Sequence, residues 1–178
     1  MSDFRFPSRV QKLRERIAKD ELDALFVSNG ENRRYVSGFV STAGYLLVTR
    51  DEAVICTDFR YTEQAAQQAP GWRVDRIGGK PDWLPKLVNE FGIENLGFEA
   101  DDMTVGTLER FKKALEEGDA SPELKPTTGI GVDLRAYKDA EELGLLQQAI
   151  DIGDQAFEET AAQLEVGMTE KQAAWIFE

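Results

Sequence analysis

Carboxylates, arginines and tyrosines are the side chains through which this sequence could carry out chemistry, because its 178 residues include no histidine. Histidine is the commonest general base near neutral pH and the commonest transition-metal ligand. Catalytic triads and most zinc, iron or manganese sites therefore lack their usual member. Any catalysis within these residues would have to use carboxylates, lysine or tyrosine.

Three pairs of neighbouring acids and one cysteine are the remaining candidates for reactive groups. No pair lies beside an apolar wall that would raise a carboxylate pKa, so a helix start or a solvated helical face is the simpler interpretation. The pairs are Asp101 with Asp102, Asp151 with Asp154, and Glu158 with Glu159. Cys56 lies in the apolar run AVICT, which favours a buried, inert thiol over a nucleophile. We expect no catalytic residue and no metal ligand in this chain.

The elements that would position polar side chains follow two alternating periods. Apolar residues recur at helical spacing in some segments and alternate, or run continuously, in others. Helices are expected over 8–19, 31–37, 59–69, 81–91 and 104–115, and strands over 24–28, 45–49, 53–57, 72–77, 95–99 and 123–127. Ser8 followed by Gln11 is a capping box at the first helix, and Gly38 ends the second.

This alternation predicts the fold class. The runs YLLVT and AVICT are separated by only three residues, so they must form an antiparallel hairpin. The remaining strands alternate with helices, which favours parallel neighbours joined by right-handed crossovers. Residues 1–127 are therefore expected to form an α/β domain, a mixed sheet with helices on its faces. Pro126 places the last strand at an edge.

The chain after residue 127 is organised differently. Residues 128–138 are rich in glycine and turn formers without either period, and we interpret them as a linker. Residues 139–178 are expected to hold a long amphipathic helix, over 139–164, and a second helix that starts with Thr169 and Gln172. That last helix presents Trp175 and its apolar neighbours without a C-terminal stop signal, so we expect the sequence to be the front of a longer protein.

Composition excludes some partners. With 21 basic and 33 acidic residues, the net charge is −12, and such a chain repels phosphate backbones, so nucleic acid is not an expected partner. No apolar run approaches the length of about 20 residues that spans a bilayer, and no secretory signal precedes the first helix. A cytoplasmic location and no membrane partner are therefore expected.

Three segments resemble a known family. ENRRYVSGF (31–39) is similar to an Asn-x-x-Tyr-x-(Thr or Ser)-Gly-Phe segment of the creatinase and Xaa-Pro peptidase family. LLVTRDEAVICTDFRYTEQA (46–65) is similar to that family's hairpin followed by Thr-Asp-x-Arg-Tyr-x-Glu-Gln-Ala. LRAYKDAEELGLLQQAIDIGDQAF (134–157), with EVGMTEKQAA (165–174), is similar to the joint where the catalytic domain begins.

The resemblance implies a creatinase N-terminal-domain-like fold, followed by a long linker helix and the first helices of a truncated "pita-bread" domain. It implies that the whole protein is a metallopeptidase, with two divalent ions such as manganese or cobalt, that cleaves the bond before proline in peptides. The metal ligands of the family follow later in the chain, so this fragment would carry no cofactor and would not be catalytic. A homodimer is implied as well.

The resemblance also implies which residues face the substrate. In relatives the N-terminal domain reaches a neighbouring protomer's active site. The residues that would contact the substrate there are Phe39, Ser41, Thr42, Asp58, Arg60 and Tyr61. A simpler interpretation is that Asp58 caps the next helix while Arg60 and Tyr61 brace the fold. Arg33 and Arg34 occupy variable positions of the family segment and are expected to face solvent or a partner.

Two alternatives stay open at this point. A creatinase-like amidinohydrolase would share this N-terminal fold and differ in its downstream chemistry. A catalytically inactive relative that binds proteins, in the manner of some histone chaperones, would fit the acidic composition. The five metal ligands expected downstream would distinguish the second alternative from both enzymes.

Overall fold

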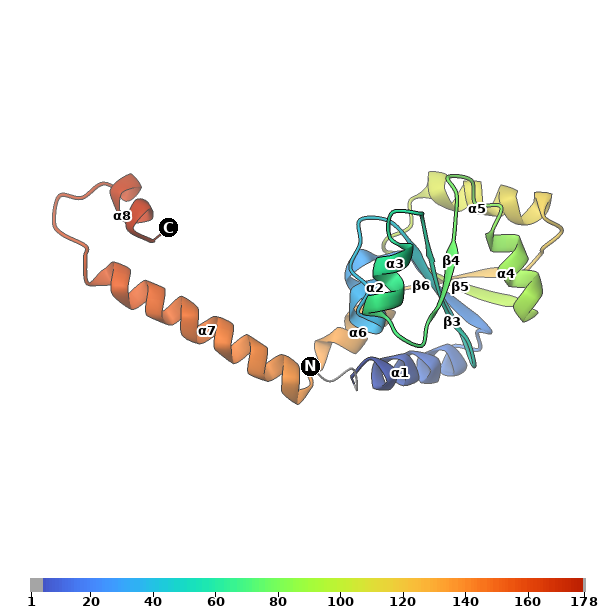
Figure 1. Cartoon of the computed structure of the whole chain (residues 1–178), viewed down its shortest axis with the longest axis horizontal. Coiled ribbons are helices and arrows are strands. Elements are labelled where there is room, and N and C mark those ends of the chain that lie inside the picture. The colour runs from blue at the N-terminus through green and yellow to red at the C-terminus, as the bar shows by residue number, and fades with distance from the viewer. Residues whose placement is uncertain (1–4, 178) are drawn as a thin grey trace. The chain divides into compact units, whose positions relative to one another are not determined.

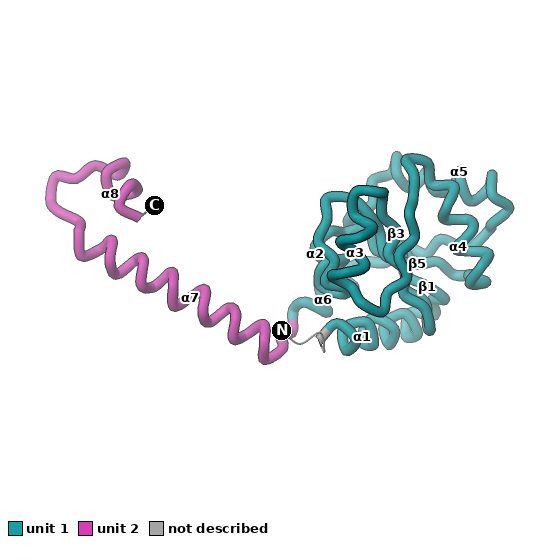
Figure 2. The backbone as a smooth tube through the Cα atoms, in the orientation of Figure 1, with its two compact units in different colours: residues 1–136 teal, residues 137–178 magenta. Residues whose placement is uncertain are grey.

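A computed structural model describes residues 5–177 of the chain. It divides into two compact units, one ending at Ala136 and one starting at Tyr137 (Figure 2). No helix within the described residues is both long and apolar enough to cross a membrane.

The first unit is built on one six-stranded mixed sheet, with strand order β4-β3-β2-β1-β5-β6 (Figure 1). Its strands are β1 (Ala24–Val27), β2 (Tyr45–Thr49), β3 (Ala53–Thr57), β4 (Arg73–Arg76), β5 (Asn95–Glu99) and β6 (Glu123–Thr127). β2 pairs antiparallel with both β1 and β3, which confirms the predicted hairpin. β1, β5 and β6 pair in parallel, as do β3 and β4, and β6 lies at an edge.

One face of the sheet is covered by four helices. These are α1 (Arg5–Lys19), α2 (Gly30–Ser37), α3 (Thr62–Gln68) and α6 (Ile130–Ala136). Leu25 and Val27 of β1 point into this layer because alternate residues of a strand face the same side. They pack there with Leu13 of α1 and Val36 of α2, all of them buried.

The opposite face is covered by α4 (Leu84–Phe91) and α5 (Val105–Glu117). Phe26 of β1 packs on this side, and its ring stacks on Tyr45 at a centroid distance of 4.9 Å. The ring of Phe111 from α5 meets Phe26 edge-on at 5.1 Å. The result is a helix–sheet–helix sandwich, which confirms the predicted α/β class.

Several boundaries differ from the sequence-based expectation. α1 already begins at Arg5, so Ser8 lies inside the helix and not at its start. α3 and α4 begin at Thr62 and Leu84, later than predicted, because residues 58–61 and the turn after Pro81 precede them. α5 begins at Val105, one residue after the expected start, and Thr104 is its N-cap, since the Thr104 hydroxyl accepts from the backbone N–H of Thr107.

The largest difference lies in residues 128–138, which were expected to be an irregular linker. They contain α6, and Ile130 is buried in the core. The hydroxyl of Tyr35 donates to the backbone oxygen of Leu134 at 3.0 Å, which ties α6 to α2. A helix of seven residues is too short to show its apolar period, and tertiary contacts decide its conformation.

The second unit consists of α7 (Ala140–Ala161) and α8 (Glu170–Phe177). Asp139 and Glu142 form a capping box at the start of α7. Thr169 and Gln172 form the predicted capping box at α8, with Thr169 N donating to Gln172 Oε1 at 2.9 Å and Gln172 N donating to Thr169 Oγ1 at 3.3 Å. The large apolar side chains of α7 are exposed, among them Leu146, Ile150 and Phe157.

Candidate functional site

Five strands of the first unit end at the same edge of the sheet. β2 runs against β1 and β3, so β1, β3, β4, β5 and β6 all point in one direction. In open α/β sheets, ligands bind in the crevice beyond these carboxyl ends. A cavity of about 700 Å³ opens at this edge, and its lining includes Ser28, Arg33, Asp58, Arg60, Asp102 and Thr104.

The loop 40–44 forms one wall of this cavity. It starts where Gly38, with φ of +80°, ends α2 in a left-handed conformation. Thr42, Ala43 and Gly44 line the cavity. Thr42 is exposed at the surface, whereas Ser41 is half-buried and turns its hydroxyl to the backbone oxygen of Ala43 at 2.7 Å. The loop therefore presents Thr42, and Ser41 serves to shape it.

Phe39 lies apart from the other predicted site residues. Its side chain is 0% exposed and belongs to the hydrophobic core beneath the loop. Its ring lies 6.4 Å from that of Tyr61, edge to face. Phe39 thus supports Tyr61 from below and is not among the residues that line the cavity.

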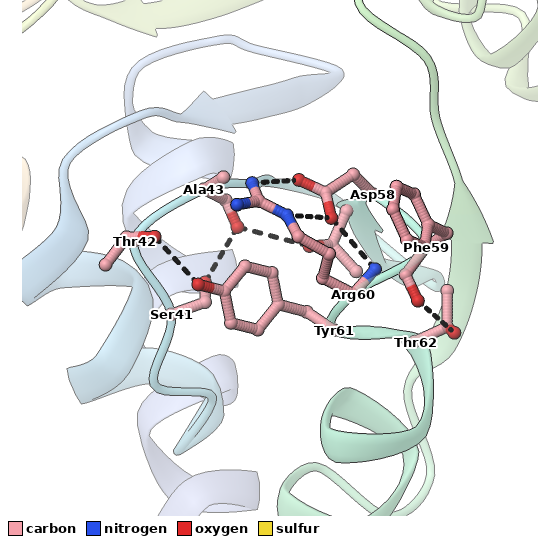
Figure 3. A network of polar contacts seen from close by, with 9 residues as sticks. Ser41, Thr42, Ala43, Asp58, Phe59, Arg60, Tyr61 and Thr62 are labelled. Atoms are coloured by element: carbon pink, nitrogen blue, oxygen red, sulfur yellow. Dashed lines mark hydrogen bonds and ion pairs between the residues drawn. The ribbon is translucent and has the colours of Figure 1, made fainter.

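Residues 58–60 form the second wall, directly after β3, and Tyr61 follows them (Figure 3). Asp58 Oδ1 accepts from Arg60 Nε at 3.0 Å, and Oδ2 accepts from Arg60 Nη2 at 2.7 Å. This bidentate pair holds the pKa of Asp58 below its ordinary value. The Nε/Nη2 edge of the Arg60 guanidinium is therefore already occupied by a carboxylate of the same corner.

Asp58 does not cap the helix that follows. Its Oδ1 accepts from the backbone N–H of Arg60 at 2.9 Å, which closes a local turn. The cap position of α3 is Tyr61, which makes no side-chain cap hydrogen bond. The Tyr61 ring lies under the Arg60 guanidinium at 5.3 Å, and its hydroxyl lies 2.8 Å from Thr42 Oγ1. The structure thus brings together Thr42, Asp58, Arg60 and Tyr61.

Arg33 does not face solvent or a partner as expected. Arg34 is exposed in agreement with the prediction, but Arg33 is only 4% exposed. Its guanidinium reaches into the cavity wall, where Nη1 donates to the backbone oxygen of Gly44 at 2.6 Å and Nη2 donates to that of Ser41 at 2.7 Å. The sequence did contain one signal for the burial of Arg33. Arg33 lies three residues before the buried Val36, and this spacing places both side chains on the same face of a helix.

A buried carboxylate anchors the start of α2 at the same edge. Glu99, at the end of β5, is 6% exposed and accepts from the backbone N–H groups of Ser28 and Asn29, both at 2.7 Å. The side-chain amide of Asn32 donates to its other oxygen at 2.6 Å. Burial raises the pKa of Glu99, although these hydrogen bonds act in the opposite direction.

The predicted acid pair Asp101 and Asp102 lies in the turn between β5 and α5, and each acid accepts a hydrogen bond from another segment of the chain. Asp102 accepts from the hydroxyl of Ser28 at 2.6 Å, and Asp101 accepts from the backbone N–H of Gly129 at 2.8 Å. Within residues 5–177, no group of three or more acidic, cysteine or histidine side chains is arranged to hold a metal ion. The polar and charged side chains that line the cavity can offer hydrogen bonds and charge complementarity to a polar ligand.

Comparison with known proteins identifies the family of this chain. The sequence profile of the creatinase/prolidase N-terminal domain matches residues 9–137. The chain belongs to this family. That confirms the resemblance carried by the segments at 31–39, 46–65 and 134–157, the first two of which lie wholly within the matched region.

The relatives of this creatinase/prolidase N-terminal domain are themselves longer proteins. This chain is 33% identical over 163 residues to the uncharacterized peptidase YqhT of Bacillus subtilis, and the aligned region covers 91% of this chain and 45% of that protein. It is 25% identical over 167 residues to the Xaa-Pro dipeptidase of Pyrococcus horikoshii, with 93% and 45% covered. The chain therefore spans about half the length of these curated relatives.

Solved structures show the same fold. The Xaa-Pro dipeptidase from Bacillus anthracis superimposes with a TM-score of 0.87 at 33% identity, over 97% of this chain and 48% of that one. The N-terminal domain of the peptidase PepQ from Mycobacterium tuberculosis gives a TM-score of 0.66 at 39% identity, over 71% of this chain and 98% of that one. The predicted creatinase N-terminal-domain-like fold is thus confirmed.

Proposed function

We propose that this chain is the N-terminal part of a dinuclear-metal Xaa-Pro peptidase, of the aminopeptidase P or prolidase type. The observation that carries the proposal is the coverage: the similarity extends through 97% of this chain but 48% of the Bacillus anthracis Xaa-Pro dipeptidase. The metal ligands and the reaction would then belong to the part of the whole protein that lies outside these residues. Two divalent ions there, manganese or cobalt, would polarise the scissile carbonyl and activate a water.

The role of this domain in that enzyme would be to assemble a dimer and to narrow a partner protomer's active site toward small proline-containing peptides. The cavity at the carboxyl ends of the strands supports this role, since Thr42, Asp58 and Arg60 line it. Exposed apolar side chains surround the same edge, namely Val40 in the loop, Phe59 after β3 and Val105 at the start of α5. Apolar groups beside polar ones suit an interface that also meets a peptide.

Arg60 would act in this site as part of a neutralised pair. Its Nε and one N–H of Nη2 already bind Asp58, so it would offer a peptide its remaining Nη1 and Nη2 donors and the face of its guanidinium. Tyr61 would contribute its ring edge beside it. Such a corner shapes a pocket more than it attracts charge, which suits a substrate-restricting role.

The decisive experiment compares the full-length protein with the 178-residue chain. After metal removal and addition of manganese or cobalt, the full-length protein should hydrolyse Ala-Pro or Gly-Pro substrates, and the 178-residue chain should be inert. Hydrolysis of creatine without cleavage of proline peptides would favour the amidinohydrolase alternative. Absence of both activities, with the downstream metal ligands missing, would favour a protein-binding relative.

Dimer formation is tested separately by light scattering on both proteins. A dimer of the full-length protein supports the proposed assembly. Because the edge residues Val40, Phe59 and Val105 are exposed, a triple change to serine should weaken that dimer. A clean monomer of the full-length protein at micromolar concentration would contradict a role for this domain in a partner's active site.

We further propose a cytoplasmic location, which the single, buried cysteine of the chain fits.

A further inference from the structure

The loop 40–44 is tied to the fold at nearly every residue. Val40 donates its N–H to Gln68 Oε1 at 2.9 Å and accepts from Gln64 Nε2 at 2.6 Å. The backbone oxygen of Ala43 accepts from Thr57 Oγ1 at 3.1 Å. With the contact between Thr42 and Tyr61, residues 40, 42 and 43 of the loop are held from α3, from Tyr61 just before it and from β3. A loop with this many partners has few alternative conformations.

Arg33 of α2 makes two further hydrogen bonds to the loop. Its Nη1 and Nη2 bind the carbonyls of Gly44 and Ser41 respectively, so one guanidinium spans the loop. The group also lies 5.9 Å from the ring of Phe39. Among the described residues, no carboxylate forms an ion pair with it, and its Nε makes no hydrogen bond.

A buried cation without an ion-pair partner among the described residues couples the loop to the helix. Removing a charged group from water is costly unless hydrogen bonds replace its hydration. Here the replacement comes from the two loop carbonyls, so a displaced loop would take from the Arg33 guanidinium both of the acceptors that it binds. Burial also lowers the pKa of Arg33. The position of the loop and the burial of this cation therefore depend on each other.

We propose that Arg33 is the positioning residue that holds the loop 40–44 in its substrate-facing conformation before any ligand binds. Arg33 is one of the residues that line the cavity, and the role assigned to it acts through the carbonyls of Ser41 and Gly44. The loop then presents Thr42 as a preformed wall and does not close over the ligand. The effect on substrate binding rests on the proposed peptidase function, whereas the effect on the loop does not.

The two acceptors explain why an arginine occupies this position. They belong to residues 41 and 44, and the planar guanidinium sends one donor to each. A lysine would place a single compact ammonium here and hold the two carbonyls less well. Methionine would keep much of the side-chain volume and hold neither. Arg34 on the same helix is exposed and provides the matched control.

Hydrogen exchange measured by mass spectrometry tests the positioning role on the 178-residue chain. In Arg33→Met, exchange of the peptide covering residues 40–45 should rise about tenfold or more, while β1 and β5 keep their wild-type rates. Arg33→Lys should show a smaller rise, and Arg34→Met none. If Arg33→Met does not fold, Arg33→Lys is compared with Arg34→Lys instead. Exchange of the peptide covering residues 40–45 should then rise in Arg33→Lys and stay unchanged in Arg34→Lys. An unchanged loop, or an equal rise throughout the fold, would overturn the proposal.

Kinetics of the full-length protein test the consequence for substrate. In Arg33→Met, KM for an Xaa-Pro dipeptide should rise about tenfold with kcat little changed, and Arg33→Lys should recover part of the loss. A loss of folded protein alone would lower the apparent kcat at constant KM, and that result would contradict a specificity role. If the wild-type protein cleaves no proline peptide, the proposed function fails, and hydrogen exchange still decides the role of Arg33.

Discussion

The hydroxyl of Thr42 lies 2.8 Å from the phenolic oxygen of Tyr61, and this contact joins the loop 40–44 to the corner that follows β3 (Figure 3). The two residues are 19 positions apart in the sequence. Tyr61 therefore has two roles, since its ring packs against the buried Phe39 while its hydroxyl holds the loop. The two walls of the cavity are thereby fixed relative to each other.

Tyr61→Phe separates these two roles, because it keeps the ring and removes the hydroxyl. We expect the free energy of unfolding to fall by about 0.5–1 kcal/mol, the usual contribution of one hydrogen bond. Urea denaturation followed by circular dichroism measures this change. Tyr137→Phe is the control, since Tyr137 is 83% exposed and should leave the midpoint unchanged. A loss of several kcal/mol would show that the phenylalanine ring does not keep the packing of Tyr61.

Glu99→Gln should change how stability depends on pH. The folded protein holds the Glu99 proton to a higher pH than the unfolded chain, because the pKa of Glu99 is raised above its ordinary value of 4.5. The folded state therefore binds more protons between those two values, and the free energy of unfolding attributable to Glu99 falls as pH rises through that window. The stability of Glu99→Gln relative to wild type should accordingly increase from about pH 4.5 upward and then level off.

The amide introduced by Glu99→Gln has a partner available for its new N–H group. Asn32 Oδ1 is buried and makes no hydrogen bond among the described residues, so rotating the Asn32 amide by half a turn lets this oxygen accept from the new amide. Chemical denaturation at a series of pH values measures the effect. Glu116→Gln, on the exposed side of α5, supplies the same change in net charge. A pH-independent difference between Glu99→Gln and wild type would contradict the prediction.

The thiol of Cys56 should be unreactive in the native protein. Cys56 lies in β3 with 0% exposure, and burial raises the pKa of its thiol far above the ordinary value, so very little thiolate forms near neutral pH. A thiol reagent such as a disulfide dye should label Cys56 only after unfolding in denaturant. Rapid labelling of the folded protein at about neutral pH would show that this face of the sheet opens.

Gly44→Ala should destabilise the protein at the cavity wall. Gly44 has φ of +130°, and an added Cβ would lie 2.9 Å from the backbone oxygen of Cys56. Strain of this kind costs on the order of 1–3 kcal/mol. Gly106→Ala is the matched control, because Gly106 lies in α5 with nothing within 4 Å of the new methyl group, and alanine favours the helix. Thermal unfolding of both variants provides the measurement, and equal melting temperatures would contradict the strain argument.

The elements with a full apolar period were predictable from sequence. The β2–β3 hairpin follows from two apolar runs three residues apart, and the end of α2 follows from Gly38. α6 was missed because Ile130–Ala136 spans only about two turns, and its conformation depends on packing of Ile130 and on the bond from Tyr35 to Leu134.

Site residues were predictable only in part, for a related reason. Residue types and a family resemblance indicated Thr42, Asp58, Arg60 and Tyr61, which the structure does bring to one edge. The same reasoning placed Phe39 among the substrate contacts and Arg33 at the surface, whereas both side chains are buried. Residue type favours solvent for an arginine, whereas the helical spacing of Arg33 to Val36 indicated burial. The type of Phe39 and its position after α2 do not state which way its ring points.

The sequence by itself determined the α/β class and the order of strands along the chain, because these depend on hydrophobic periods and turn residues that act over a few positions. Three segments that resemble the family indicated the family. Only the tertiary structure decided that a buried arginine supports the loop 40–44 and that Asp58 already occupies the Nε/Nη2 edge of Arg60. Those relationships depend on the parallel strands ending at one edge, which brings distant segments of the chain within hydrogen-bonding distance.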